Sequence, residues 1–176
     1  MHVTMPENIS AVHEGDKISV SQNQWLDVYE TPGHARCSLS FLLHPENILF
    51  PGDAAGVMEK NTTIKPLFLS SYTEYIASLE KITALNAEVL ALPHNQVIKG
   101  RKNVQEFFNH SLLETQKLRA KIFHELQIST DFNAIAKKLL SQEYSLPTIN
   151  GPREALLINL TAMVKSIYNE FFKISE

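Results

Sequence analysis

The sequence has 176 residues, of which 44% are hydrophobic and 20% are charged, and a formal net charge of −3. This length suffices for one domain with its own core, or for a small domain with a helical appendage. The weak negative charge gives no electrostatic basis for binding nucleic acid or an anionic membrane. No apolar run approaches the ~20 residues of a membrane span, and the single cysteine, Cys37, excludes an internal disulfide.

The first ten residues, MHVTMPENIS, contain neither a basic nor an apolar segment, and so predict no signal peptide. One cysteine also fits a reducing compartment. We therefore expect a cytoplasmic protein.

Residues 1–100 predict an α/β arrangement of short strands with one crossover helix. A tight turn is expected at Glu14–Asp16. Ser71 and Glu74 have capping-box spacing, and the helix that they begin would stop near Asn86. Runs rich in branched and aromatic residues predict the strands. The predicted strands are 9–13, 17–20, 24–29, 38–43, 47–50 and 88–92.

Residues 101–176 predict a C-terminal α-helical extension. Asn103 and Glu106 suit a first helix start, Ser129–Asp131 cap a shorter helix, and Asn150–Pro152 precede a last one. Each helix carries an apolar stripe at helical spacing, which is more typical of packing than of a cofactor site. The stripes are Val104, Phe107, Phe108, Leu118, Ile122 and Leu126; Phe132, Ile135, Ala136, Leu139 and Leu140; and Leu156, Leu160, Val164, Ile167 and Phe171.

Three loops present an ionisable side chain directly after a predicted strand. They hold His34 in TPGHA, Asp53 in FPGDA and His94 in LPHN. Loops at strand ends of α/β sheets often converge on a ligand. Two imidazoles and a carboxylate suit zinc or a pair of divalent ions. The three positions are distant in sequence, so only the fold could bring them together.

Each of these residues also has a structural interpretation. His34 could be an ordinary hydrogen-bonded residue of a Pro-Gly turn. Asp53 could cap its loop, because Gly-Asp is a common turn pair. His94 could bond backbone carbonyls near the end of a buried strand. Of the other candidates, Cys37 is interpreted as a small buried residue rather than a ligand, and His110 and His124 as part of a solvated helix face.

The order of the motifs resembles the second half of a metallo-β-lactamase-fold hydrolase. The run QWLDVYETPGHARCSLSFLLHPENILFPGDAAG, then a helix and EVLALPHNQVIKG, is similar to the family pattern over residues 9–100. The resemblance implies the αββα-type fold, with residues 1–100 as the C-terminal half of the domain. It implies that His34 binds a first metal, that His94 binds a second, and that Asp53 bridges both as the catalytic carboxylate. The helical extension, 101–176, resembles that of family members that hydrolyse esters or thioesters.

The sequence departs from this family in one large respect. The H-x-H-x-D-H motif, which belongs to the first half of the fold, has no match, since only His2 and His13 precede His34. Three of roughly seven metal-site positions are therefore present. Arg36–Ser38 also replaces the family's Gly-Ser after the histidine, and His94 lacks a flanking glycine.

The resemblance implies the C-terminal portion of a metal-dependent hydrolase, with zinc as the expected metal, whose small-molecule substrate contains an ester, thioester or related bond. We expect it to be inactive or incomplete as this chain alone. The alternative is a non-catalytic remnant or an oligomerising module of the same fold. Because a half-sandwich exposes an apolar sheet face, we expect a homodimer or a partner chain that supplies the missing half. No nucleic-acid or membrane partner is expected.

Overall fold

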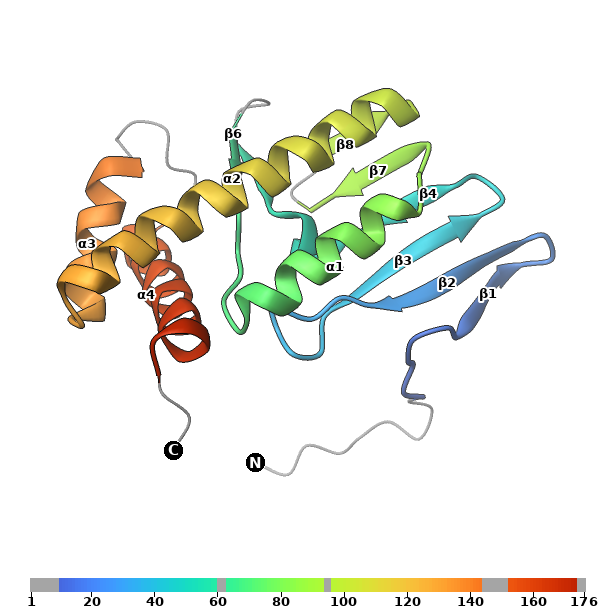
Figure 1. Ribbon diagram of the computed structural model, residues 1–176. Coiled ribbons are helices and arrows are strands. Elements are labelled where there is room, and N and C mark those ends of the chain that lie inside the picture. Colours follow the sequence, from blue (N-terminus) through green and yellow to red (C-terminus); the bar gives the residue numbers. More distant parts are fainter. Residues whose placement is uncertain (1–9, 60–62, 94–95, 144–151, 174–176) are drawn as a thin grey trace.

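The computed structural model describes residues 10–59, 63–93, 96–143 and 152–173. Its main element is a six-stranded sheet with the order β1-β2-β3-β4-β7-β8 (Figure 1). All neighbouring strands are antiparallel except β4 and β7, which are parallel. The strands are β1 (Lys17–Ser21), β2 (Gln24–Glu30), β3 (Leu39–His44), β4 (Ile48–Phe50), β7 (Val89–Leu92) and β8 (Gln96–Lys99).

Helix α1 (Tyr72–Ala84) makes the crossover between β4 and β7. The Ser71 hydroxyl accepts a hydrogen bond from the Glu74 backbone N–H (3.1 Å), as the capping spacing predicts. The helix ends before Asn86, which has a φ of +53°. Asparagine tolerates this left-handed conformation better than most residues do. The predicted helix and its stop are therefore confirmed.

One face of the sheet is covered by α1 and by the first half of α2 (Arg101–Ile128), as Figure 1 shows. The side chains between sheet and helices are almost fully buried, so this layer forms the first core. Its buried members are Leu42, Leu49, Ala54, Ala55, Ile64, Leu79, Ile82, Ala87, Leu90, Leu92, Val104, Phe107 and Phe108.

The opposite face of the sheet is apolar and carries no helix among the described residues. The register pairs Leu26 with Leu43 and Phe41 with Phe50, which places these side chains on one side of the sheet. With Val20 they line a shallow hollow whose lining is wholly apolar. Val20 is 54% exposed and Phe50 is 40% exposed. We call these five residues the open face.

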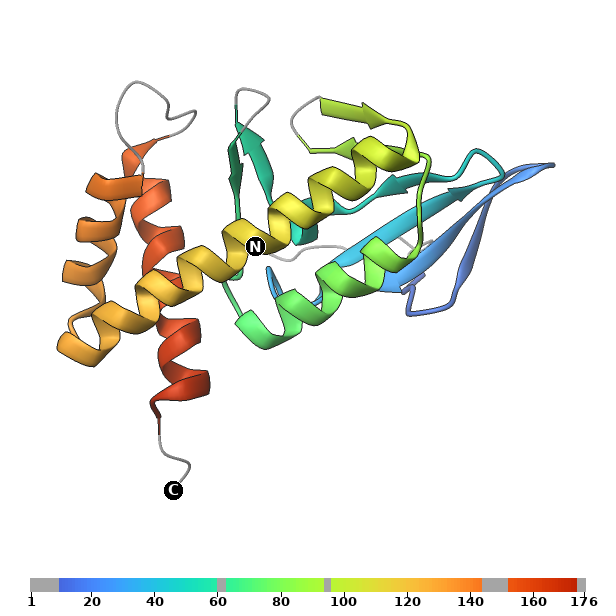
Figure 2. The same cartoon turned by 45° about the horizontal axis from the view of Figure 1, so that its top comes forward.

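The C-terminal helices α3 (Phe132–Glu143) and α4 (Arg153–Phe171) pack against the second half of α2 (Figure 2). This second core also includes Phe68, which precedes α1, and Tyr75, which lies in the first turn of α1. Helix α2 contributes to both cores, and the proposed division at residue 100 stays a prediction.

The predicted starts of the second and third helices of the extension are confirmed, whereas α2 begins at Arg101, two residues before the predicted Asn103. Helix α4 follows Pro152 directly, whereas Asn150 and Gly151 lie outside the described residues. The Asp131 carboxylate accepts a hydrogen bond from the Ala134 N–H (3.0 Å), so it caps α3 as predicted. None of the described helices combines the length and apolar composition that a membrane span requires.

Several elements differ from the sequence-based prediction. Residues 10–13 of the predicted strand 9–13 form no strand, while Ile9 lies outside the described residues. The Asp16 carboxylate accepts a hydrogen bond from the His13 N–H (2.8 Å), which closes the predicted turn there. Strand β1 pairs with β2 and not with residues 10–13. The elements that the sequence did not predict are the hairpin β5 (Val57–Glu59) and β6 (Thr63–Lys65), the 3-10 helix η1 (Gly52–Ala55), and β8.

Candidate metal centre

The Pro32–Gly33 turn presents His34 just beyond the end of β2. Gly33 has a φ of +123°, and a Cβ at this position would overlap the backbone of Tyr75 in α1. Its carbonyl accepts hydrogen bonds from the Ser70 N–H (2.9 Å) and the Ser71 N–H (3.2 Å). Glycine is required here because the turn lies directly against the start of α1.

The His34 ring is held at one nitrogen and directed at Asp53 with the other. Its Nδ1 lies 3.0 Å from the carbonyl oxygen of Leu67, which can only accept a hydrogen bond, so Nδ1 carries a proton. In the neutral ring Nε2 would then have a free lone pair. Nε2 lies 3.5 Å from Oδ2 of Asp53. Metal-binding histidines are commonly oriented by such a bond from the second ring nitrogen to a carbonyl.

Asp53 lies in η1, immediately after β4, and its carboxylate is partly exposed. A separation of 3.5 Å is long for a charge-assisted hydrogen bond. It is close to the ~3.4 Å between two ligands that each lie ~2.1 Å from a tetrahedral zinc ion. The two side chains therefore fit a shared divalent cation.

A buried pair of hydroxyl groups connects the two loops. Oγ of Ser40 in β3 donates to the carbonyl of Pro51 (3.1 Å), and Oγ1 of Thr31 lies 2.9 Å from the same Ser40 oxygen. Thr31 precedes the His34 turn and Pro51 precedes η1. This bridge links the backbones that carry His34 and Asp53.

Tyr75 lies beneath this site, with its side chain fully buried. Its hydroxyl has no hydrogen-bond partner among the described residues. Burial raises the pKa of the Tyr75 phenol well above its usual value. The nearby Leu67 backbone lowers this pKa by a smaller amount, and the negative charge of Asp53 raises it. Tyr75 therefore stays protonated at neutral pH.

The sequence predicted one further ligand, His94. His94 lies outside the described residues, so its predicted role stays a prediction. Within the described ranges, no group of three or more His, Cys, Asp or Glu side chains could hold a metal ion. The interpretation of Cys37 as buried is wrong, because it lies exposed in the turn between the Ala35 carbonyl and the Ser38 N–H, before β3 begins.

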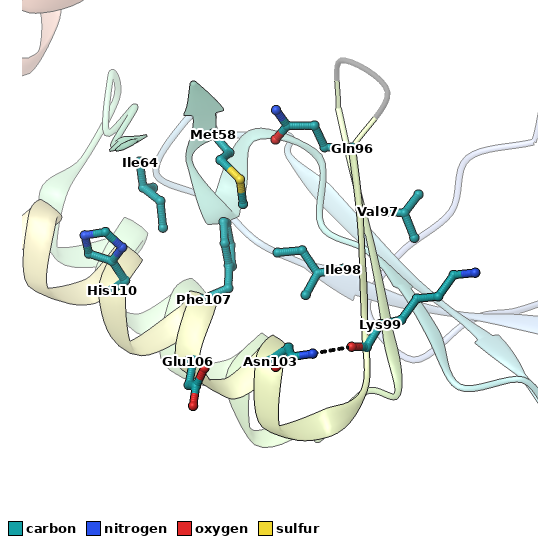
Figure 3. A pocket seen from close by; sticks show the side chains of 10 residues that line it. All are labelled: Met58, Ile64, Gln96, Val97, Ile98, Lys99, Asn103, Glu106, Phe107 and His110. Carbon is teal, nitrogen blue, oxygen red and sulfur yellow. Dashed lines mark hydrogen bonds between the residues drawn. The ribbon is translucent and has the colours of Figure 1, made fainter. Parts of the chain in front are cut away.

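A pocket of about 670 Å³ lies between β8, the β5–β6 hairpin and α2 (Figure 3). Met58, Ile98 and Phe107 point into it, and Gln96 and His110 lie around them. The side-chain amide oxygen of Gln96, Oε1, is buried and has no hydrogen-bond partner in the described residues. The sequence placed His110 on a solvated helix face. It pairs there with Glu114 at 3.5 Å, and it also lines this pocket.

The part of the chain that forms the sheet and its loops is similar to a known protein family. Residues 12–94 match the sequence model of the metallo-beta-lactamase superfamily. The predicted resemblance of this part of the chain to the metallo-beta-lactamase superfamily is confirmed. The predicted α/β fold of that superfamily, with a helical C-terminal part, is confirmed. No curated protein sequence matches the chain.

Solved structures of the superfamily share this fold. A metallo-beta-lactamase family protein from Thermus thermophilus aligns over 94% of this chain and 50% of its own, with a TM-score of 0.69 and 21% identity. An archaeal superfamily protein from Sulfolobus tokodaii aligns over 90% of this chain and 51% of its own, with a TM-score of 0.54 and 18% identity. The inverting sec-alkylsulfatase Pisa1 from Pseudomonas sp. aligns over 96% of this chain and 27% of its own, with a TM-score of 0.56 and 13% identity. The chain thus spans about half the length of the first two structures.

Sequence reasoning missed the residues that support the site. Leu67, Ser40 and Tyr75 contribute a carbonyl, a hydroxyl and a packing surface, and none resembles a metal ligand. Tyr75 was detectable, because it lies four residues after Ser71 and four before Leu79 on the same helix face. The contacts of Leu67 and Ser40 depend on tertiary packing, so no local pattern indicates them.

Proposed function

We propose that this chain is the C-terminal portion of a metal-dependent hydrolase, with His34 and Asp53 as ligands of a zinc centre. The observation that carries the proposal is the spacing of His34 Nε2 and Asp53 Oδ2, 3.5 Å, with His34 Nδ1 held by the Leu67 carbonyl. When bound, zinc would supply a nucleophilic water at neutral pH and polarise the scissile bond. His94, two residues before β8, is the proposed third ligand.

The protein residues have separate roles in this proposal. His34 would donate a neutral imidazole, whose tautomer is set by Leu67. Asp53 would contribute negative charge and a carboxylate that can face two ions. Superfamily members include hydrolases, and the similar Pisa1 structure is that of a sec-alkylsulfatase. We propose an ester, thioester or related bond as the one hydrolysed.

The pocket in Figure 3 supports a substrate with both apolar and polar groups, because Met58 and Phe107 line it together with charged side chains such as Glu106. Its volume of about 670 Å³ lies within the usual range of ligand pockets. Two of its lining residues are close in sequence to the proposed ligands, since Met58 follows Asp53 by five residues and Gln96 follows His94 by two. The Gln96 side-chain oxygen Oε1, which has no partner among the described residues, would accept a hydrogen bond from a donor on the substrate.

Zinc binding tests the proposal directly. We would titrate the chain with zinc in competition with a chromophoric chelator, and compare His34→Ala and Asp53→Asn with the control His124→Ala, an exposed histidine on α2. Each ligand variant should weaken zinc binding at least tenfold, because each removes one of few ligands, and the control should bind like the wild type. Equal affinity of all four proteins would overturn the proposal.

A second candidate function is a non-catalytic module that associates through the open face. This face is apolar, and its Val20 and Phe50 side chains are among the more exposed large hydrophobic residues described. The occupant that we propose is a second copy of the chain, because two identical apolar faces can cover each other in a symmetric contact. A chain that carries the other half of the fold is the alternative occupant.

A further inference from the structure

The C-terminal end of α4 binds the first turn of α1. Glu170 Oε1 accepts a hydrogen bond from the Tyr72 N–H (2.8 Å). Its Oε2 accepts from the Thr73 N–H (3.1 Å) and the Thr73 hydroxyl (2.7 Å). The first N–H groups of a helix have no partner within the helix, and a carboxylate there also interacts favourably with the helix dipole. Glu170 therefore stabilises the start of α1 from 97 residues away.

The residues just before this first turn hold the turn that presents His34. Both the N–H and the hydroxyl of Ser70 donate to the Gly33 carbonyl (2.9 Å each), and the Ser71 N–H donates to it at 3.2 Å. Further along the helix, the Ser78 hydroxyl donates to the Pro32 carbonyl (2.7 Å). The backbone immediately before His34 is thus bonded to α1 at its N-terminal half.

The end of α4 is itself fixed on two neighbouring helices. The Arg119 guanidinium of α2 lies 4.7 Å from the ring centre of Phe171 and 5.6 Å from that of Tyr72. The rings of Tyr72 and Phe171 also meet edge to face, with centres 6.2 Å apart. Cation–π and aromatic contacts of this kind stabilise close packing. Glu170 is therefore held in place by packing next to it.

We propose that Glu170 is a positioning residue for His34. It stabilises the first turn of α1, Ser70 and Ser71 hold the Gly33 carbonyl, and Gly33 sets the direction of the His34 ring toward Asp53. The helical extension would then be part of the metal centre's support and not a separate binding module. The effect of Glu170 on the conformation of the His34 turn does not depend on the proposed function. Only the expected effect on zinc affinity rests on that function.

Hydrogen exchange of the metal-free chain, followed by NMR, tests the first step. In Glu170→Ala, the N–H groups of Ser70 to Thr73 should exchange at least tenfold faster, whereas those of the β1–β2 ladder should keep the wild-type rate. Glu170→Gln keeps one acceptor oxygen and should give an intermediate rate. Glu154→Ala, at the exposed start of the same helix, is the matched control and should change none of these rates. Equal acceleration over the whole chain, or none at Ser70 and Ser71, would overturn the proposal.

Two further readouts separate positioning from general stability. The ¹⁵N shifts of the His34 ring should show the single Nδ1–H tautomer in the wild type and a mixture in Glu170→Ala. Zinc affinity should fall about tenfold, as is typical when the support of a ligand is lost. If Glu170→Ala does not fold, Thr73→Val removes one of the three hydrogen bonds and should produce the same local changes with smaller size. Wild-type protein that binds no zinc but shows the exchange pattern would contradict the proposed function alone.

Discussion

The hydroxyl oxygens of Thr31 and Ser40 lie 2.9 Å apart in the interior, between the two loops of the candidate metal centre. Because the Ser40 hydrogen is directed at the Pro51 carbonyl, the Thr31 hydroxyl must donate to Ser40. Both side chains are fully buried. The relative position of His34 and Asp53 thus depends on a polar contact inside the sheet layer.

Ser40→Ala should therefore destabilise the fold and loosen the site. The substitution leaves the Thr31 hydroxyl buried without its Ser40 partner, and leaves the Pro51 carbonyl with only the Ala54 N–H (3.3 Å). Loss of a partner at a buried polar group costs about 1–3 kcal/mol. Urea unfolding would measure this loss, and the zinc affinity of the variant should fall as well. Ser141→Ala removes an exposed hydroxyl that bonds the Lys138 carbonyl, and should change the unfolding free energy by less than ~0.5 kcal/mol. Equal unfolding free energies for the two variants would contradict the bridge.

Gly33→Ala should be far more damaging than Gly15→Ala. Both glycines have positive φ, +123° and +84°, so both substitutions introduce backbone strain. Only Gly33 also abuts the Tyr75 backbone, while a Cβ at Gly15 meets nothing within 4 Å. We expect a loss of roughly 3 kcal/mol or more at Gly33 and of about 1–2 kcal/mol at Gly15. Comparing denaturant midpoints of the two variants checks this difference. A similar loss in both would show that the close approach to α1 is unimportant.

The buried phenol of Tyr75 predicts a loss of stability in alkali. Its pKa is raised by burial, so the folded protein keeps this proton at a pH where the unfolded chain releases it. The stabilisation is complete below pH ~10, the pKa of an unperturbed tyrosine, and is lost progressively above it. Above that pH, the ionisation of Tyr75 should lower the free energy of unfolding by up to about 1.4 kcal/mol per pH unit.

Tyr75→Phe isolates this effect, because it removes the titrating hydroxyl and keeps the ring. At pH 7 the variant should be as stable as the wild type or slightly more so, since the hydroxyl has no hydrogen-bond partner among the described residues. Between about pH 9.5 and 11, a window around the ordinary tyrosine pKa, the wild type should lose stability faster than the variant in urea unfolding. Parallel pH profiles would rule out a raised Tyr75 pKa.

Substitutions on the open face test self-association. Phe50→Asp introduces a charge into this apolar surface, at a side chain that is 40% exposed, and should weaken dimerisation at least tenfold. Ile158→Asp is the control, because Ile158 is 68% exposed on α4, away from the sheet. Sedimentation equilibrium of the three proteins gives the dissociation constants. A monomeric wild type would contradict the homodimer and favour a partner with the other half of the fold.

Local patterns in the sequence predicted much of this protein correctly. The capping pair Ser71 and Glu74 marked the start of α1, and apolar spacing predicted the helices of the extension. The order of the TPGH, GD and PH motifs was enough to indicate the superfamily. These features depend on residues within a few positions of each other or on their order, so they are visible without the fold.

Other features depended on the tertiary structure. Strand β8 and the β5–β6 hairpin form because a pairing partner is available, and short segments such as 96–99 carry no periodicity of their own. The contacts of His34 with Leu67 and of Thr73 with Glu170 join residues 33 and 97 positions apart. A carbonyl or a helix-terminal carboxylate has no sequence signature as a support, because its partner is chosen by packing. The sequence by itself therefore identified candidate metal ligands, whereas only the fold decided which groups hold them in place.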